Sequence, residues 1–403
     1  MEYITLKQIF YEKNEMWETE YHARFNSSFT KHLDFDIKEY NHADKFKLFY
    51  CYNEDISQLQ NNILAATIAF FKCLEAIPGA GIKQFIEACL VDEIKASNDI
   101  EGVRSTRKEI MEAFDQKGKP KKYLRLWGIV NKYKKIINND NVLLNTCQDI
   151  RNLYDDFILD EILRDDPQCV PDGNLFRKDS VDIITSTQKT IHRGIYPESK
   201  IIATMTSALN ILHDKSIPSL IRISIFHYLF GYIHPFYDGN GRMSRFITSY
   251  YLAKEIHPSI ALRLSLLIKL QKNKYYSLFH LTNSCKNRGD ITPFIIRSLE
   301  LVLIAIQSTT TILEKKLILL NDYRNKMNEV LDLSDKTVDR IYDILLQASI
   351  FSNSGASIEE ISNTMNKNPK TIRKYIDLQP KENIEIDKTI RPYRYKLNTN
   401  ILK

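Results

Sequence analysis

One segment of the sequence combines a titratable side chain, two flexible backbone positions and two cations. It is HPFYDGNGRMSR, residues 234–245. Gly239 and Gly241 lack a Cβ, so the backbone there lets a ligand approach closely. Arg242 and Arg245 lie three positions apart and reach one face of a helix. This pattern favours a site for a highly charged anion such as a polyphosphate.

Two helices are expected to hold this segment. The apolar residues before it predict a buried helix that ends at His234, because Pro235 disfavours a helical backbone at the preceding residue. The apolar residues after it recur at helical spacing: Met243, Phe246, Ile247, Tyr250 and Tyr251. The loop therefore delivers the N-terminus of the second helix, where unpaired N–H groups and the helix dipole attract anions. Two arginines oppose that dipole, and a bound anion resolves the conflict.

Two further side chains complete the chemistry predicted for this loop. His234 is the candidate general base, because a histidine side chain titrates near neutral pH. Asp238 is the candidate Mg²⁺ ligand, because Mg²⁺ binds through one or two carboxylates together with the phosphates of a substrate. An ordinary helix–loop–helix turn explains any one of these residues but not the whole set.

The segment resembles the Fic family motif, HPFx[DE]GNGRxxR, at every specified position, and the resemblance extends over residues 80–310. It implies a protein adenylyltransferase, which transfers AMP from ATP to a Ser, Thr or Tyr hydroxyl of a target protein and releases pyrophosphate. By the same resemblance, Gly239, Asn240, Gly241 and Arg242 form the anion hole and Arg245 meets the γ-phosphate. ATP and Mg²⁺ are the implied cofactors, with Asp238, Gly239 and their neighbours as ligands.

Two other segments are similar to parts of Fic proteins. The stretch similar to the adenosine-side helix holds Tyr275, Tyr276 and Asn283. Core packing explains the two tyrosines equally well. Residues 176–195 are rich in Val, Ile and Thr between turn signals and predict a β-hairpin. Val181 and Ile183 in this hairpin are similar to the family's flap, which aligns a target backbone by strand addition.

An acidic residue stands at an unfavourable end of a helix. The helix predicted to begin near Lys83 ends at Gly102, a favourable residue just past a helix end. Glu101 then lies at the negative end of the helix dipole, where a carboxylate is destabilising without a cation. A solvated carboxylate is the simplest explanation. The stretch from Ser97 to Gly102 nevertheless resembles the Fic inhibitory motif [ST]xxxE[GN], which implies that Glu101 pairs with Arg245 in the place of the γ-phosphate.

Residues 335–403 predict three helices followed by two short strands, an order that resembles a winged helix. Lys370, Arg373 and Lys374 share the exposed face of the third helix, as in a recognition helix. This part of the chain carries 12 basic and 9 acidic residues, a net charge of +3, which is a weak footprint for DNA. Contact with DNA and contact with protein, including a homodimer, both stay open.

The composition favours long helices. Of 403 residues, 43% are hydrophobic and 26% charged, with only 12 glycines and 12 prolines to form tight turns. We expect a mainly α protein: a Fic-type helical bundle with a small β-hairpin flap and a C-terminal winged helix-turn-helix domain. The expected divisions are an N-terminal helical region with the inhibitory helix, the Fic core, a connecting helix and the winged-helix unit, at residues 1–110, 111–310, 311–334 and 335–403.

Charge and cysteine content bound the cellular setting. The formal net charge of +6 does not by itself indicate nucleic acid. No apolar run reaches the roughly 18 residues that span a membrane, and the first residues do not resemble a signal peptide. The six cysteines are scattered without a CxxC motif. We therefore expect reduced thiols in a cytoplasmic protein, with no disulfide framework, zinc site or membrane contact.

Two other functions stay open. One is a DNA-binding regulator whose Fic core senses ATP, although a pure sensor does not need His234. The other is a related phosphotransferase or a de-AMPylating enzyme on the same fold. The intact Gly241, Arg242 and Arg245 favour nucleotide transfer over phosphate transfer.

Overall fold

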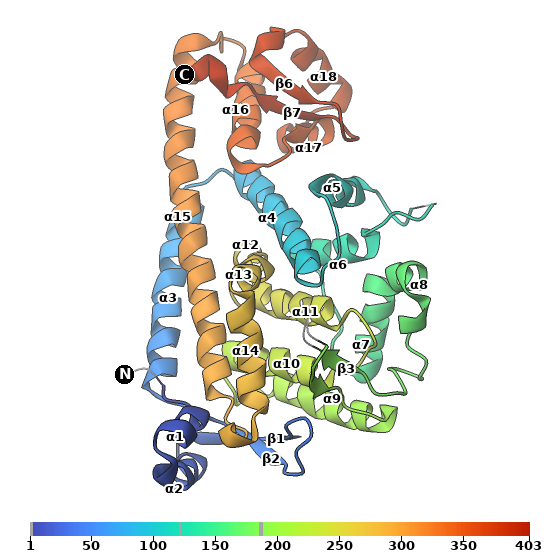
Figure 1. Cartoon of the computed structure of the whole chain (residues 1–403). Coiled ribbons are helices and arrows are strands. Elements are labelled where there is room, and N and C mark those ends of the chain that lie inside the picture. Colours follow the sequence, from blue (N-terminus) through green and yellow to red (C-terminus); the bar gives the residue numbers. More distant parts are fainter. Residues whose placement is uncertain (1–2, 121, 185–187) are drawn as a thin grey trace.

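The computed structural model of the chain describes residues 3–120, 122–184 and 188–403 (Figure 1). Helices make up most of this part, and the strands within it form three small sheets. The prediction of a mainly α protein is therefore confirmed. Buried apolar side chains from every region join in one continuous core.

The longest helix, α15 (Thr292–Val330), packs along α3 (Glu54–Glu75), and the two run side by side down one edge of the molecule (Figure 1). α15 buries one apolar residue in every seven: Leu299, Ile306, Leu313, Leu320 and Met327. α3 buries Ile56, Ile63 and Phe70 with the same spacing. A seven-residue repeat keeps one apolar stripe facing a neighbouring helix, which explains why these two helices pair.

Two expectations about α15 need correction. The connecting helix expected at 311–334 is not a separate element, because α15 continues through the polar run 308–311 without a break. α15 also holds an 18-residue window with a mean hydropathy of 1.4, of which 39% is buried. By length and composition, α15 is the one helix among the described residues that could cross a membrane, whereas the sequence analysis expected no such segment. Its packing on α3 gives the apolar stripe a place in the core.

The sequence analysis expected a helical N-terminal region, but this region also contains two β-strands. α1 (Leu6–Glu12) and α2 (Asn14–Phe25) precede an antiparallel hairpin of β1 (Thr30–Ile37) and β2 (Phe46–Cys51). Leu33, Phe35 and Ile37 are buried, while Asp34 and Asp36 between them are exposed. This alternation with a period of two is typical of a strand with one face on the core.

Three helices form the centre of the region that carries the motif. They are α9 (Glu198–His213), α10 (Ser219–Ile233) and α11 (Asn240–Glu255), and α10 packs against both of the others. α10 is buried on almost every side, which explains its nearly continuous apolar sequence. α4 (Gly79–Ile100) packs against α11 and, more extensively, against α13.

Shorter elements surround this centre. On one side are α5 (Arg107–Asp115), α6 (Trp127–Ile137), α7 (Cys147–Tyr154), a π-helical turn (Asp155–Leu159) and α8 (Asp160–Asp165). Near α15 are α12 (Pro258–Ala261), α13 (Leu264–Leu270) and α14 (Lys272–Asn283). The expected hairpin in 176–195 is confirmed as β3 (Asp182–Ile184) paired with β4 (Thr190–Arg193).

The C-terminal unit, residues 335–403, contains the three helices and two strands that the sequence predicts. They are α16 (Lys336–Phe351), α17 (Ile358–Met365), α18 (Pro369–Asp377), β6 (Ile384–Asp387) and β7 (Arg394–Leu397). A short additional strand, β5 (Ala356–Ser357), pairs with β7, so the sheet order is β5-β7-β6. α16 packs on α4, and the buried Arg394 bridges Glu360 of this unit and Asp115 of α5.

Candidate active site

A tight turn between α10 and α11 carries the candidate catalytic residues. α10 ends at Ile233, and His234 follows with a φ of 53°, in the left-handed region. Its N–H still donates to the Phe230 carbonyl at 3.0 Å, which closes the helix. The predicted end of this helix before Pro235 is therefore confirmed.

Phe236 and Asn240 fix the shape of the turn. The Phe236 ring is fully buried and stacks on Tyr154, with ring centroids 3.8 Å apart. The Asn240 side chain accepts from the Phe236 N–H at 3.0 Å and donates to the Phe236 carbonyl at 2.8 Å. Gly239 precedes α11 with a φ of 84°, which a residue with a Cβ rarely adopts. Anchored at both ends, the turn holds the first N–H groups of α11 in one place.

Two arginines lie buried at the start of α11. Arg245 is only 1% exposed and donates to the hydroxyl and the carbonyl of Ser97, both at 3.0 Å. Arg242 is 3% exposed, and its Nη1 lies 3.2 Å from Glu161 Oε2. Its Nη2 lies 3.6 Å from Asp238 Oδ2. Each guanidinium is thus held in a fixed orientation by partners, as a buried charge requires.

The Glu101 carboxylate fills the space beside Gly241 and Arg245. Glu101 caps the C-terminal end of α4, and its Oε1 lies 2.8 Å from Arg245 Nη2. A Cβ at Gly241 would overlap this carboxylate, so the missing side chain makes room for it. Burial alone would raise the pKa of Glu101, but the charge and hydrogen bond of Arg245 and the charge of Arg242 outweigh burial and lower it. The expected ion pair is present; its inhibitory role stays a prediction.

His234 is uncharged at neutral pH. Burial, followed by the charges of His192 and Arg177, lowers the pKa of His234 to about 3. Glu101 acts in the opposite direction but more weakly. Arg177 is itself fully buried, and its Nε donates to the His234 carbonyl at 3.0 Å. A neutral imidazole keeps a lone pair that can accept a proton.

A cavity of about 180 Å³ opens beside the turn. It is lined by nine of the residues named from the sequence: His234, Asn240, Gly241, Arg245, Ile183, Tyr275, Tyr276, Asn283 and Glu101. The other five lie outside its lining: Gly239, Asp238, Arg242, Val181 and Ser97. The cavity is therefore apolar and aromatic on one side and has a cation and a helix N-terminus on the other, a combination that is common in small-molecule sites.

Comparison with known proteins matches residues 145–252 to the Fic/DOC family. Residues 145–252 form a Fic/DOC family domain. Protein adenylyltransferase Fic of Drosophila yakuba is 36% identical over 87 residues, which are 22% of this chain and 16% of that protein. The Drosophila melanogaster protein of the same name is 34% identical over the same shares. The chain thus spans about a sixth of the length of these curated relatives.

The fold agrees with this assignment. The crystal structure of a Fic family protein from Desulfovibrio desulfuricans G20 is similar, with a TM-score of 0.51 and 19% sequence identity. The similarity covers 86% of this chain and 97% of that chain. The Fic-type fold predicted from the motif is therefore confirmed, whereas the winged-helix description of the C-terminal unit stays a prediction.

The residues expected on the adenosine side of the Fic domain contact α10. The Tyr275 hydroxyl lies 2.7 Å from Nε2 of the buried His227, and the Tyr228 hydroxyl donates to Asn283 Oδ1 at 2.6 Å. Tyr276 is 37% exposed and open to the cavity. Tyr275 and Asn283 therefore also tie α14 to α10, so both the packing role and the binding role of Tyr275 fit its position.

Asp238 and Val181 take positions at the edge of the Fic domain site. Asp238 Oδ1 accepts from the Gly239 N–H at 2.6 Å, and half of the Asp238 side chain is exposed. The Val181 carbonyl accepts from the Gly194 N–H at 2.9 Å, just before β3 begins. Ile183 pairs with His192 across the hairpin and lines the cavity.

Several residues of the site were missing from the sequence interpretation. Arg177 holds the His234 carbonyl, Glu161 holds Arg242, and His192 lines the cavity. No local pattern marks these residues, because each contact joins positions at least forty residues apart in the sequence. The described cysteines are free thiols, as expected. Outside the Fic domain, Glu39, His42 and Cys285 each place one potential metal-ligand atom within 4.8 Å of the others. The search for a CxxC motif in the sequence did not reveal this cluster.

Proposed function

We propose that this chain is a protein adenylyltransferase that transfers AMP from ATP to a Ser, Thr or Tyr hydroxyl of a target protein, and that Glu101 inhibits it. The observation that carries the proposal is the Glu101–Arg245 ion pair in the same cavity as the neutral His234. A carboxylate at the N-terminus of a helix marks a position that binds anions. The names of the Drosophila relatives support AMP as the transferred group.

In the proposed reaction, the oxygen of the target hydroxyl attacks the α-phosphorus of ATP. A bond forms between them, the bond from the α-phosphorus to the bridging oxygen of the β-phosphate breaks, and pyrophosphate leaves. The proton of the hydroxyl goes to the imidazole of His234. A polyphosphate beside His234 raises the pKa of this imidazole, because nearby negative charge favours the protonated form. The pKa of His234, which is low in the ligand-free site, thus rises when ATP binds.

The other residues position the substrate and balance its charge. The α11 N-terminus and Gly241 hold the phosphates, and Arg245 takes the γ-phosphate once Glu101 leaves. Ser97 keeps Arg245 in place through two hydrogen bonds that do not involve Glu101. Such fixed donors stabilise developing negative charge without reorganising during the reaction.

The surroundings of Asp238 fit a Mg²⁺ ion. The carboxylate is half exposed, and its Oδ1 accepts a hydrogen bond from Gly239. Its Oδ2 lies 3.6 Å from Arg242 Nη2 and accepts no hydrogen bond from the described residues. A single carboxylate suits Mg²⁺, which takes most of its other ligands from phosphates and water. When bound, Mg²⁺ would neutralise phosphate charge. Asp238 would hold the ion, and Glu161 would keep Arg242 beside it.

Transfer of label from ATP tests the proposal. The Glu101→Gly protein is incubated with Mg²⁺, a cell lysate and ATP labelled on either the α- or the γ-phosphate. We expect protein-bound label from α-labelled ATP only, an AMP adduct in the mass spectrum, and loss of both in the Glu101→Gly/His234→Ala protein. The double variant should still bind ATP in calorimetry, because His234 is not among the groups that hold the phosphates.

The same assay separates the alternatives. Label from γ-labelled ATP with a phosphate adduct would indicate a phosphotransferase. Loss of AMP from a premodified target, in wild-type protein but not in the Glu101→Gly protein, would indicate removal of AMP. If the protein binds ATP but forms neither an AMP nor a phosphate adduct in a cytoplasmic extract or another lysate, the result would indicate a regulator that senses ATP. The experiment therefore rejects adenylyl transfer if no α-label reaches protein.

A further inference from the structure

A second and larger cavity, of about 620 Å³, lies beside the Fic domain site. We call it the hairpin groove. Its walls are β1 with the loop that follows it, β4 with the segment up to Tyr196, and the residues of α9 from Lys200 to Ser207. α9 packs against β1, so the groove is a depression between elements that are in contact.

The hairpin groove adjoins the catalytic cavity. His192 and Tyr232 line both cavities. Between them runs β4, whose end packs directly on the catalytic turn: a Cβ at Gly194 would lie 3.0 Å from the Cβ of His234. The Tyr232 hydroxyl in turn accepts from the Lys38 N–H at 2.8 Å, which ties the loop after β1 to α10. A polypeptide that presents a hydroxyl to His234 therefore has its neighbouring residues within reach of the groove, at about 3.3–3.6 Å per residue.

The charges of the groove are unbalanced. Asp34 and Asp36 share one cation, since Lys47 lies 3.1 Å from Asp34 and 3.9 Å from Asp36, and Glu39 accepts from the Cys285 backbone N–H at 2.8 Å. Arg193 is likewise paired, with Asp182 of β3.

Three lysines of the groove lack such partners. Lys38, Lys45 and Lys200 are exposed and have no acidic partner among the described residues. Tyr40 and Tyr196 lie on the same walls and add aromatic surface. The basic residues of the lining (Lys38, Lys45, Lys47, Lys200 and Arg193) outnumber its acidic residues (Asp34, Asp36 and Glu39). The groove therefore has a net positive charge, next to a site whose proposed substrate is a protein.

We infer that the hairpin groove binds an acidic segment of the target protein, next to the hydroxyl that is modified. The inference rests on the proposed function, because it names the recognition of the protein that receives AMP. Complementary charge at an exposed surface raises the association rate and selects partners more than it adds affinity. Binding through the groove should therefore be sensitive to salt.

A binding assay on the full chain tests the groove without relying on catalysis. The probes are two fluorescent peptides that share a central Ser-Thr-Tyr segment, one flanked by glutamates and the other by lysines. The test variant is Lys38→Glu/Lys45→Glu/Lys200→Glu. The matched control is Lys370→Glu/Arg373→Glu/Lys374→Glu on α18, which changes the net charge equally and lies in the C-terminal unit. Circular dichroism checks that each variant folds, and Lys→Ala versions of the same triple serve if the glutamates disturb folding.

We expect the wild-type protein to bind the glutamate peptide at least about tenfold more tightly than the lysine peptide at low salt. The groove variant should lose this preference, and the control variant should keep it. Equal binding of both peptides, or a preference that survives in the groove variant, would overturn the inference. Self-modification with α-labelled ATP in the Glu101→Gly background is measured separately, so a failure of adenylyl transfer is distinguishable from a failure of the groove.

Discussion

Glu101 and Arg245 join the ends of two helices of opposite polarity. Glu101 lies at the negative C-terminal end of α4, and Arg245 lies in the positive first turns of α11. Neither residue suits its own helix, because a carboxylate at a C-terminus and a cation at an N-terminus both oppose the dipole. Their 2.8 Å contact offsets both penalties and places an anion at the position proposed for a nucleotide phosphate.

Under the proposed function, replacement of Glu101 should raise the rate of AMP transfer. A hydrogen bond to a charged group contributes about 1.5–3 kcal/mol, so Glu101→Gly should raise the rate of AMP transfer about tenfold to a hundredfold. Glu101→Gln keeps a hydrogen-bond acceptor without the charge, so its rate of AMP transfer should lie between the rates of the wild-type and Glu101→Gly proteins. Initial rates of self-modification at fixed ATP measure the series, and Glu314→Gln, at an exposed position on α15, is the control. A Glu101→Gly protein no more active than wild type would exclude the inhibitory role.

A methyl group at Gly241 should break the Glu101–Arg245 ion pair without raising activity. The Cβ of Gly241→Ala would overlap the Glu101 carboxylate, so the variant should break the Glu101–Arg245 pair. The same methyl group occupies the space that phosphates need, so the variant should stay inactive. Calorimetric titration should find ATP binding weakened at least about tenfold relative to Glu101→Gly. Gly79→Ala is the matched control, since a Cβ there meets nothing within 4 Å. Full activity of the Gly241→Ala protein would contradict this assignment of the phosphate position.

His227 should make stability depend on pH. Burial, together with the charge of Arg245, lowers the pKa of His227 to about 3, from 6.5 in an unperturbed histidine. Between these values the unfolded chain binds a proton that the folded chain does not. The free energy of unfolding should therefore fall as the pH drops through this window, by at most about 1.4 kcal/mol per pH unit for this one group.

The His227→Gln protein should lose this contribution. Urea unfolding at several pH values should give a flatter pH dependence for His227→Gln than for wild type, even if the variant is less stable throughout. His22→Gln, on the exposed α2, is the control. An unchanged slope in the His227→Gln protein would contradict a neutral, buried His227.

The local geometry of the site was predictable from the sequence. The end of α10 at His234 and the start of α11 follow from Pro235, Gly239 and the apolar spacing, all within a few residues. The Glu101–Arg245 pair joins positions 144 residues apart, and only the resemblance to a known motif indicated it. The contacts of Arg177 and Glu161 had no such motif, so reasoning from one sequence missed them.

The errors in the fold have physical causes too. The sequence analysis placed a boundary between residues 310 and 311, within the polar run 308–311. Three of these four side chains hydrogen-bond to the carbonyl three or four residues earlier and leave α15 intact. β1 has eight residues, but its alternation of buried and exposed residues covers only residues 33–37. An alternation of only five residues, between the helices α2 and α3, was too short to predict a strand from the sequence.

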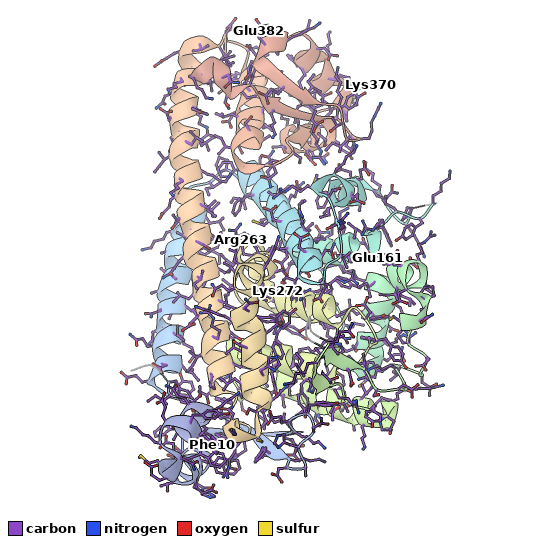
Figure 2. The ribbon with its side chains drawn as sticks, in the orientation of Figure 1. Phe10, Glu161, Arg263, Lys272, Lys370 and Glu382 are labelled. Atoms are coloured by element: carbon purple, nitrogen blue, oxygen red, sulfur yellow. The ribbon has the colours of Figure 1, made fainter. Side chains whose placement is uncertain are left out.

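We propose that the C-terminal unit contacts DNA through α18. Ile372 and Ile376 face the core of the unit, which leaves Lys370, Arg373 and Lys374 exposed on the opposite face. Figure 2 shows Lys370 on the outer side of the unit, away from α15. α16 of the same unit packs on α4, the helix that ends at Glu101.

Anisotropy of a labelled DNA duplex checks this contact. If three cations each neutralise one phosphate, the slope of log K against log salt should be about −2.7. The variant Lys370→Glu/Arg373→Glu/Lys374→Glu should lose binding, and Lys38→Glu/Lys45→Glu/Lys200→Glu, with the same change in net charge, should retain most of it. Absence of binding at low salt would remove DNA as the partner. Equal loss in both variants would mean that net charge, and not α18, attracts the duplex.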